Sequence, residues 1–154
     1  GIRDRSPSRG LGDVYKRRYR ALVLSNLVAI HQKTGIGRLS AYCGAVSAGA
    51  AAGAGIAYLC GGGYEEVIHT VVNALAIVSG MVCDGAKASC AAKIASSVDA
   101  GILGYNMYLR GQQFYAGDGI VTKGVEATIQ NIGRLGKDGM KETNEEIIKM
   151  MISD

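Results

Sequence analysis

Residues 39–64 read LSAYCGAVSAGAAAGAGIAYLCGGGY, a stretch of 26 residues without a charged side chain. Glycine, alanine and serine make up most of it, and its strong aliphatic residues are Leu39, Val46, Ile56 and Leu59. Small side chains let neighbouring helix backbones approach closely, and the spacing Ala45-Gly49-Gly53 places three of them on one helical face. The stretch therefore predicts a helix that other helices cover on all sides.

The segments that follow and precede this stretch have the apolar spacing of helices. Helical patterns run over residues 22–31, 67–81, 87–109, 124–135 and 143–151. The chain has 23 glycines, 20 alanines, one proline and no tryptophan, and it contains few alternating β-branched runs. These features argue against a β-sandwich or a β-barrel. The predicted fold is all-α, a compact bundle of about five or six Gly/Ala-rich helices.

A membrane protein is the main alternative for this composition. A spanning helix needs ~20 apolar residues, and residues 39–64 are long enough. However, Gly, Ala and Ser insert into membranes far more weakly than Leu or Ile, and His69 and Asn73 interrupt the next apolar run. A buried helix in a soluble bundle accounts for the same features. We predict a cytoplasmic protein without membrane contact, and a non-catalytic helical membrane or assembly module is the alternative function.

Positive charge is concentrated at the start of the chain. The formal net charge is +4, and residues 1–20 contain seven Lys or Arg against two Asp. Residues 21–154 contain ten basic against eleven acidic side chains. A nucleic-acid surface needs basic residues spread over the folded part of a protein. The sequence therefore predicts no nucleic-acid partner.

Residues 1–18 are predicted to form a disordered or non-native leader. The segment lacks periodicity up to Tyr15 and is rich in Gly, Ser, Pro and Arg. Residues 13–17, which read DVYKR, also look like a translated sequencing adaptor. The helical domain is expected to cover residues 19–154.

The cysteines are the residues whose grouping suggests chemistry. Cys83 and Cys90 are seven positions apart, close to two helical turns. A turn signal after Cys83 moves the expected helix start to about Ala86, which puts Cys83 at the mouth of the helix and Cys90 just over one turn inside it. Backbone N–H groups at such an end stabilise thiolates, which bind soft metals. Cys43 comes within reach only if its helix packs beside this one.

The spacing of these cysteines leaves more than one interpretation open. No C-x2-C pair is present, which argues against a structural zinc site. An iron–sulfur cluster tolerates dispersed ligands better. Free cysteines are also often buried as small hydrophobic residues, and this is the role expected for Cys60.

Several motifs resemble those of the L-cysteine desulfidase family, which is related to the iron–sulfur L-serine dehydratase alpha chain. They are GRLSAYCG at residues 37–44, GMVCDGAKASCA at 80–91, GDGI at 117–120 and NIGR at 131–134. The motif at residues 80–91 is the most distinctive of them. The resemblance covers about residues 21–154 and corresponds to the carboxy-terminal part of a family with much longer members.

The resemblance implies an oxygen-sensitive enzyme that holds a [4Fe-4S] cluster on three cysteines. Matched by position, its ligands are Cys43, Cys83 and Cys90. Family members often carry a further cysteine two residues after the first, where this chain has Ala45. Related dehydratases also have a substrate loop of the type Ser-Gly-Asn-His-Gly in their amino-terminal part, and this chain lacks it. The fragment alone is therefore expected to be inactive, and a missing amino-terminal domain is its expected partner.

The reaction implied by the resemblance is a β-elimination on a small amino acid. L-cysteine or L-serine is converted to pyruvate and ammonia, with release of sulfide or water. Three thiolate ligands leave one iron open as a Lewis acid for the substrate. Lys87 and Ser89, between two of the ligand cysteines, are the candidate substrate-binding residues. A homo-oligomeric assembly is left open.

The remaining titratable residues have structural roles as their simpler interpretation. Asp84 is expected to be a helix N-cap and Asp99 a buried, hydrogen-bonded carboxylate. His31 and His69 are the available histidine bases, and both are expected to be structural. No residue is assigned as the general base.

Overall fold

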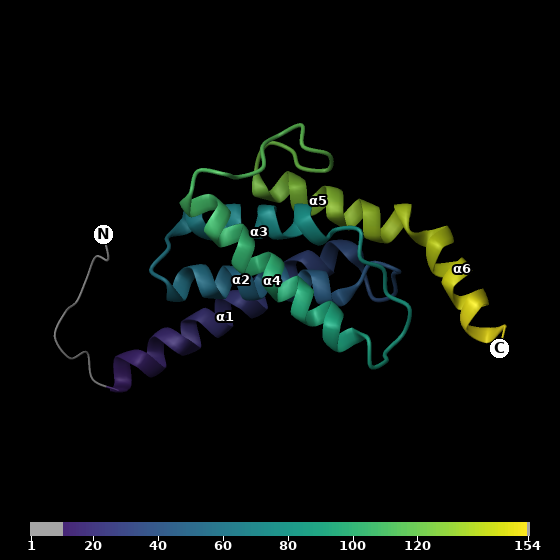
Figure 1. Ribbon diagram of the computed structural model, residues 1–154, viewed down its shortest axis with the longest axis horizontal. Coiled ribbons are helices and arrows are strands. Elements are labelled where there is room, and N and C mark those ends of the chain that lie inside the picture. The colour runs from purple at the N-terminus through teal and green to yellow at the C-terminus, as the bar shows by residue number, and fades with distance from the viewer. Residues whose placement is uncertain (1–10, 154) are drawn as a thin grey trace.

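The computed structural model describes residues 11–153, and within them the chain is helical (Figure 1). The elements are α1 (Leu11–Ile36), α2 (Gly44–Leu59), α3 (Tyr64–Val78), α4 (Cys90–Leu109), α5 (Val125–Arg134), a π-helical turn η1 (Leu135–Gly139) and α6 (Lys141–Ile152). The described residues contain no strand, although Tyr42 and Val82 form an isolated antiparallel bridge. The all-α bundle predicted from the sequence is confirmed.

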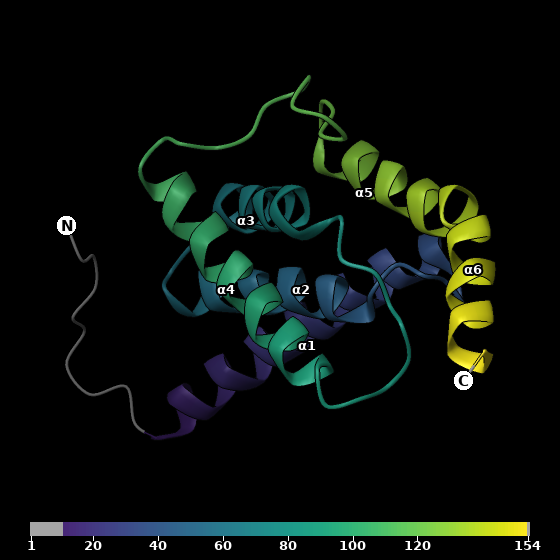
Figure 2. The same cartoon turned by 45° about the vertical axis from the view of Figure 1, so that its right-hand side comes forward.

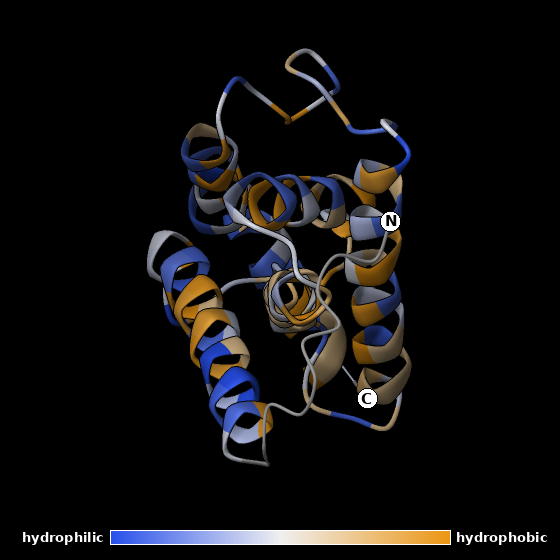
Figure 3. Cartoon of the chain, turned by 90° about the vertical axis from the view of Figure 1, so that its left-hand side faces the viewer, coloured by the Kyte–Doolittle hydropathy of each residue, from blue (hydrophilic) through white to orange (hydrophobic). Residues whose placement is uncertain are grey.

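Helix α2 lies at the centre of the bundle, as the uncharged stretch predicted. It packs against α1, α3 and α4, and Figure 3 looks nearly along its axis with these three helices around it. Val46, Ala50 and Ala54 on α2 are fully buried. The core continues into Leu75 of α3 and Ile132 of α5. A helix so rich in alanine is stable here because its surroundings exclude water on nearly every side.

Glycines on α2 bring its backbone into contact with α4. A Cβ atom at Gly49 would lie 2.3 Å from the carbonyl carbon of Ser97, and one at Gly53 would lie 2.8 Å from the Cα of Gly101. Both contacts pair a residue of α2 with the residue 48 positions later, so the two helices run in the same direction. Their N-terminal ends therefore lie at the same end of the bundle.

The polar residue Asn73, which interrupts the apolar run of α3, is hydrogen-bonded through its side chain. Asn73 on α3 is fully buried, and its side-chain amide donates to the carbonyl of Gly104 at 2.9 Å. Its side-chain oxygen accepts from the N–H of Phe114 at 3.0 Å. Asn73 thus joins α3, α4 and the loop after α4, which is why a polar residue is stable at this position. Among residues 11–153, no helix combines the length and apolarity needed to cross a bilayer.

Helix α1 begins inside the segment that was predicted as a disordered or non-native leader, residues 1–18. Residues 11–18 form the first turns of α1. The guanidinium of Arg17 donates to the carbonyl of Leu59 at 2.9 Å, at the C-terminal end of α2. A cation is favourable at this end of a helix because of the helix dipole. Residues 1–10 of the expected leader lie outside the described residues.

The start of α4 differs from its predicted position near Ala86. The helix begins at Cys90, and residues 86–89 form bends and a turn. Gly85 has φ +92°, a left-handed conformation that suits glycine and carries the chain away from a helical path. Figure 2 shows the long connection from α3 that leads down to this helix start. Cys90 is therefore the first residue of α4 rather than one turn inside it.

Candidate functional site

Cys43 and Cys83 lie beside each other because two connecting segments meet in the Tyr42–Val82 bridge. The N–H of Cys43 donates to the carbonyl of Met81 at 3.1 Å, and the N–H of Cys83 donates to the carbonyl of Ala41 at 2.6 Å. Side chains alternate along paired segments, so both cysteines fall on the face opposite to Tyr42 and Val82. They are diagonal neighbours across the bridge.

The segment that carries Cys43 is held from the far end of the chain. The hydroxyl of Ser40 donates to the carbonyl of Gly136 in η1 at 2.5 Å, and it accepts from the N–H of Tyr42 at 2.9 Å. Tyr42 is buried, and a Cβ atom at Gly136 would lie 3.2 Å from the Cβ of Tyr42. The π-helical turn therefore packs directly against the residue before Cys43. Turns of this kind are frequent at functional sites.

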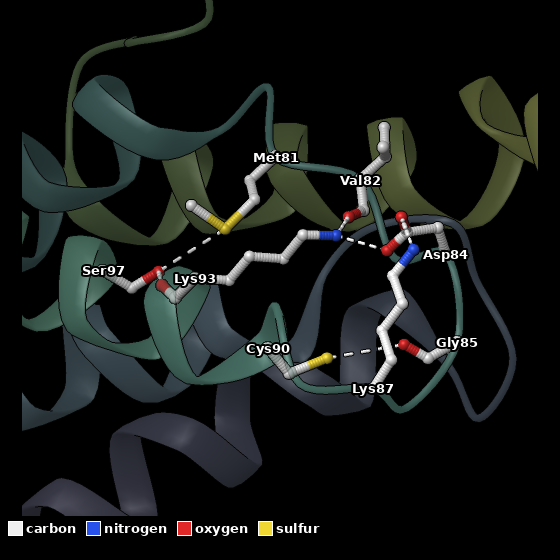
Figure 4. Close-up of polar contacts among 8 residues, drawn as sticks. All are labelled: Met81, Val82, Asp84, Gly85, Lys87, Cys90, Lys93 and Ser97. Carbon is white, nitrogen blue, oxygen red and sulfur yellow. Dashed lines mark hydrogen bonds and ion pairs between the residues drawn. The ribbon is translucent and has the colours of Figure 1, made fainter.

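Cys90 joins the same end of the bundle at the start of α4. Its thiol contacts the carbonyl of Gly85 at 3.4 Å, so the loop after Cys83 curls back onto the helix start (Figure 4). Cys43 is the N-cap residue of α2, and α2 and α4 begin at the same end of the bundle. Two helix N-termini, whose dipoles favour thiolates, therefore lie close to these cysteines.

A charged cluster formed by Asp84, Lys87 and Lys93 lies beside the segment that carries Cys90 (Figure 4). The Asp84 carboxylate pairs with Lys87 at 2.5 Å and also with the ammonium of Lys93. Hydrogen bonds from Lys87 and then Lys93 hold the pKa of Asp84 well below its usual range. The prediction that Asp84 is an N-cap is wrong, since Ser89 precedes α4 and Asp84 is occupied by the two lysines.

Lys93 is the site residue that the sequence analysis missed. Its Nζ donates to the carbonyl of Val82 at 2.9 Å in addition to the Asp84 contact. The Asp84 carboxylate raises the pKa of Lys93, and the thiols of Cys43 and Cys90 act in the same direction. Lys93 and Cys90 both belong to the first turn of α4. The sequence did indicate that Lys93 lies near Cys90, because it follows that residue by three positions and residues i and i+3 share a helical face.

The two predicted substrate-binding residues lie at the rim of this region. Lys87 is half exposed and forms its ion pair with Asp84. Ser89 is exposed and makes no capping hydrogen bond with its side chain. The fourth cysteine, Cys60, is the C-cap of α2 and so lies at the opposite end of that helix from Cys43. The expectation that Cys60 is buried is wrong, because the three glycines that follow α2 leave it exposed.

Three further titratable residues lie on separate helices: His31 on α1, His69 on α3 and Asp99 on α4. Asp99 is exposed on α4, so the prediction of a buried carboxylate is wrong. It lies on the face of α4 away from the contact through Ser97 and Gly101. His31 contacts the carboxylate of Glu126 at 2.7 Å. His69 stacks on Tyr108 with ring centroids 4.9 Å apart.

The donor set suits an iron–sulfur cluster in kind but does not form a cage for a single ion. Cys43, Cys83 and Cys90 are free thiols, the first buried and the others half-buried. Nowhere in residues 11–153 do three His, Cys, Asp or Glu side chains gather closely enough to hold a metal ion. Thiolates are the usual ligands of iron–sulfur clusters, and the ammonium groups of Lys87 and Lys93 offset their negative charge. The three donors are thus of the chemical type that an iron–sulfur cluster uses, while the described residues contain no group of three such side chains gathered around one point.

Comparison with known proteins gives close relatives of this chain. It is 70% identical over 135 residues to a UPF0597 protein of Desulfitobacterium hafniense. The matched region covers 88% of this chain and 31% of that protein. It is 59% identical to a UPF0597 protein of Lachnoclostridium phytofermentans, over 87% of this chain and 32% of the relative. A UPF0597 protein of Treponema denticola is 55% identical, over 88% of this chain and 31% of that relative. The chain thus spans about a third of the length of these curated relatives.

No solved structure matches the chain. A family described as "Serine dehydratase alpha chain" matches residues 8–149, which include most of the folded elements and part of the expected leader. The motifs around Cys43, Cys83 and Cys90 all fall within this match. The chain therefore belongs to the serine dehydratase alpha chain family.

Proposed function

We propose that this chain is the cluster-binding part of an iron–sulfur-dependent lyase. The full-length enzyme deaminates L-cysteine or L-serine to pyruvate and ammonia by β-elimination, with release of sulfide or water. The observation that carries the proposal is that Cys43, Cys83 and Cys90 come from three segments to one end of the bundle. Membership of the serine dehydratase alpha chain family supports it.

A [4Fe-4S] cluster would be held by Cys43, Cys83 and Cys90. When bound, such a cluster would supply an iron without a protein ligand, which would act as a Lewis acid toward the substrate. The protein's part is to fix the ligands: the Tyr42–Val82 bridge sets the first two, and the start of α4 sets the third. All four cysteines are free, which suits a cytoplasmic enzyme in a reducing compartment.

Lys87 and Ser89 are proposed to bind the substrate. Both side chains are exposed beside the ligand cysteines, and the Ser89 hydroxyl makes no capping bond that a ligand would have to break. The Lys87 ammonium can turn from Asp84 to a substrate carboxylate because Lys93 still pairs with Asp84. A general base is proposed to come from the part of the enzyme that this sequence does not contain. Separation of the base from the cluster ligands explains why the fragment is expected to be inactive.

The proposal is tested by anaerobic reconstitution with ferrous iron and sulfide. The chain is expected to become brown and to retain iron and acid-labile sulfide in equal amounts after desalting. It should not form pyruvate from L-serine or L-cysteine on its own. The full-length relative from Desulfitobacterium hafniense should form pyruvate and ammonia after the same treatment. Retention of no iron by either protein would contradict the proposal, and an inactive but folded relative would favour an assembly module.

The exposed face of α1 is proposed to contact the rest of the full-length enzyme. Seven large apolar side chains of α1 are exposed: Val14, Tyr15, Tyr19, Leu22, Val23, Leu27 and Ile30. The first half of α1 also projects from the bundle, at the lower left of Figure 1. An apolar surface of this kind marks an interaction site. Because the curated relatives are about three times as long as the matched region, their remaining residues are the proposed occupant.

If α1 makes this contact, a charged side chain introduced on its exposed face should strongly weaken the association with the rest of the enzyme. The probe is the part of the Desulfitobacterium hafniense relative outside the 135 matched residues, co-expressed with this chain. Leu27→Asp is expected to weaken their association at least tenfold, about 1.4 kcal/mol, because it buries a charge in an apolar contact. Leu109→Asp, on α4 and equally exposed, is the matched control. The full-length relative should also protect its α1 equivalent from amide hydrogen exchange. A homodimer of this chain that buries α1, without association with the probe, would contradict the proposal.

A further inference from the structure

Lys93 connects a helix to the two residues that flank Cys83. From the first turn of α4, its Nζ reaches the carbonyl of Val82 at 2.9 Å and the carboxylate of Asp84 (Figure 4). Its side chain is 20% exposed, against 49% for Lys87. Helix α4 is thus bonded to the residue before Cys83 and to the residue after it.

The bridge explains why Val82 offers its carbonyl to Lys93. The backbone bonds that form the bridge run from Cys43 to Met81 and from Cys83 to Ala41. This pattern makes Tyr42 and Val82 a non-hydrogen-bonded pair, whose own N–H and C=O groups point away from each other. The Val82 carbonyl therefore takes no part in the bridge and is free to accept a hydrogen bond from Lys93. The Cys83 segment is fixed by Ala41 on one side and by α4 on the other.

Lys87 differs from Lys93 because it does not belong to a helix. It belongs to the same loop as Asp84 and lies three residues after it, so their ion pair links the loop to itself. Lys93 belongs to α4, which packs along α2 and α3 and is a rigid element of the bundle. The Lys93 contacts therefore transmit the position of a helix to the loop, in addition to the contact of the Cys90 thiol with Gly85.

We propose that Lys93 is a positioning residue that fixes the Cys83 segment against the start of α4, and so sets the distance between Cys83 and Cys90. The role in cluster binding rests on the proposed function, whereas the contacts to Val82 and Asp84 do not. A single side chain thereby joins both neighbours of Cys83 to the helix that begins at Cys90.

The inference is tested first on the metal-free chain by amide hydrogen exchange. Lys93→Met is expected to increase the exchange rate of the Cys83 amide about three- to tenfold, because that segment loses its tie to α4. Amides of α3, such as that of Val71, should keep their protection. Lys93→Arg should restore protection of Cys83, since a guanidinium can donate to both Val82 and Asp84. Lys87→Met, which removes a lysine from the same charged cluster, is the matched control and should change the rate less than twofold.

A second measurement addresses the cluster. After reconstitution, Lys93→Met should lose iron several times faster than the original chain, and Lys93→Arg should lose it at nearly the original rate. Equal protection of the Cys83 amide in Lys93→Met and the original chain would overturn the inference, as would equal effects of Lys93→Met and Lys87→Met. If Lys93→Met does not fold, Asp84→Asn replaces it, and unchanged exchange at Cys83 in that variant would overturn the inference. Absence of a cluster in the original chain would refute the proposed function and leave the exchange result to decide the role of Lys93.

Discussion

Replacement of Cys83 by serine is expected to abolish iron–sulfur binding, whereas Cys60→Ser leaves it intact. Cys83 sits on the bridge beside Cys43, while Cys60 ends α2 on the opposite side of the bundle. A serine hydroxyl does not replace a thiolate as a ligand for iron in these clusters, because the cluster prefers sulfur donors. Cys90→Ser should give the same loss as Cys83→Ser. The measurement is iron and acid-labile sulfide per chain, with visible absorption, after anaerobic reconstitution.

Cys83 and Cys90 are better test positions than Cys43. Both are half-buried, so a hydroxyl at either position remains partly hydrated. Cys43 is buried in the core, where a serine hydroxyl costs about 1–3 kcal/mol of stability unless it is hydrogen-bonded. Unfolding curves in urea must therefore show that Cys83→Ser keeps the stability of the original chain. Iron retention by Cys83→Ser equal to that of Cys60→Ser would remove Cys83 from the proposed ligand set.

The sequence predicted the centre of the fold because residues 39–64 are compatible with few environments. A chain segment without charge and with few large side chains must be covered, and its glycines then bring helix backbones together. The observed contacts of Gly49 and Gly53 with α4 follow from that requirement. The helix class was also predictable, since apolar spacing near 3.6 residues recurs along the chain.

The helix ends were less predictable, because they depend on contacts with distant residues. Composition suggested that residues 11–18 lie outside the fold, but Arg17 binds Leu59, which is 42 positions away. The turn signal at Asp84-Gly85 predicts a start of α4 near Ala86, which is four residues too early. The chain makes a further turn at residues 86–89 before Cys90.

The candidate site could be predicted only through the family resemblance. Cys43 and Cys83 meet through one isolated bridge, and neither segment has the alternating pattern of a strand. No local rule pairs two such loops 40 residues apart. Lys93 was missed for a related reason, since its function depends on the free carbonyl of Val82, which only the paired structure reveals.

Gly49→Ala is expected to destabilise the chain by about 2 kcal/mol, although alanine is the better helix former. The new Cβ atom would lie 2.3 Å from both the carbonyl carbon and the carbonyl oxygen of Ser97, and these backbone atoms cannot turn aside as a flexible side chain can. Overpacking of this kind costs about 3 kcal/mol, and the helix propensity of alanine returns about 1 kcal/mol. Chemical unfolding monitored by circular dichroism measures the difference. Gly44→Ala is the matched control on the same helix, because nothing lies within 4 Å of a Cβ atom there. It should change stability by less than about 0.5 kcal/mol.

The double variant with Ser97→Gly separates a backbone contact from a side-chain contact. Ser97→Gly removes the Ser97 Cβ, which would lie 2.5 Å from the new atom, but leaves the two nearer backbone atoms. Gly49→Ala should therefore lower the free energy of unfolding in the Ser97→Gly background by most of the amount that it does in the original chain. Any separation of α2 from α4 also moves Cys43 away from Cys90, because these residues begin the two helices. Iron retention should consequently fall in Gly49→Ala even under conditions in which the variant is fully folded. A Gly49→Ala chain as stable as Gly44→Ala would show that the two backbones are not in contact.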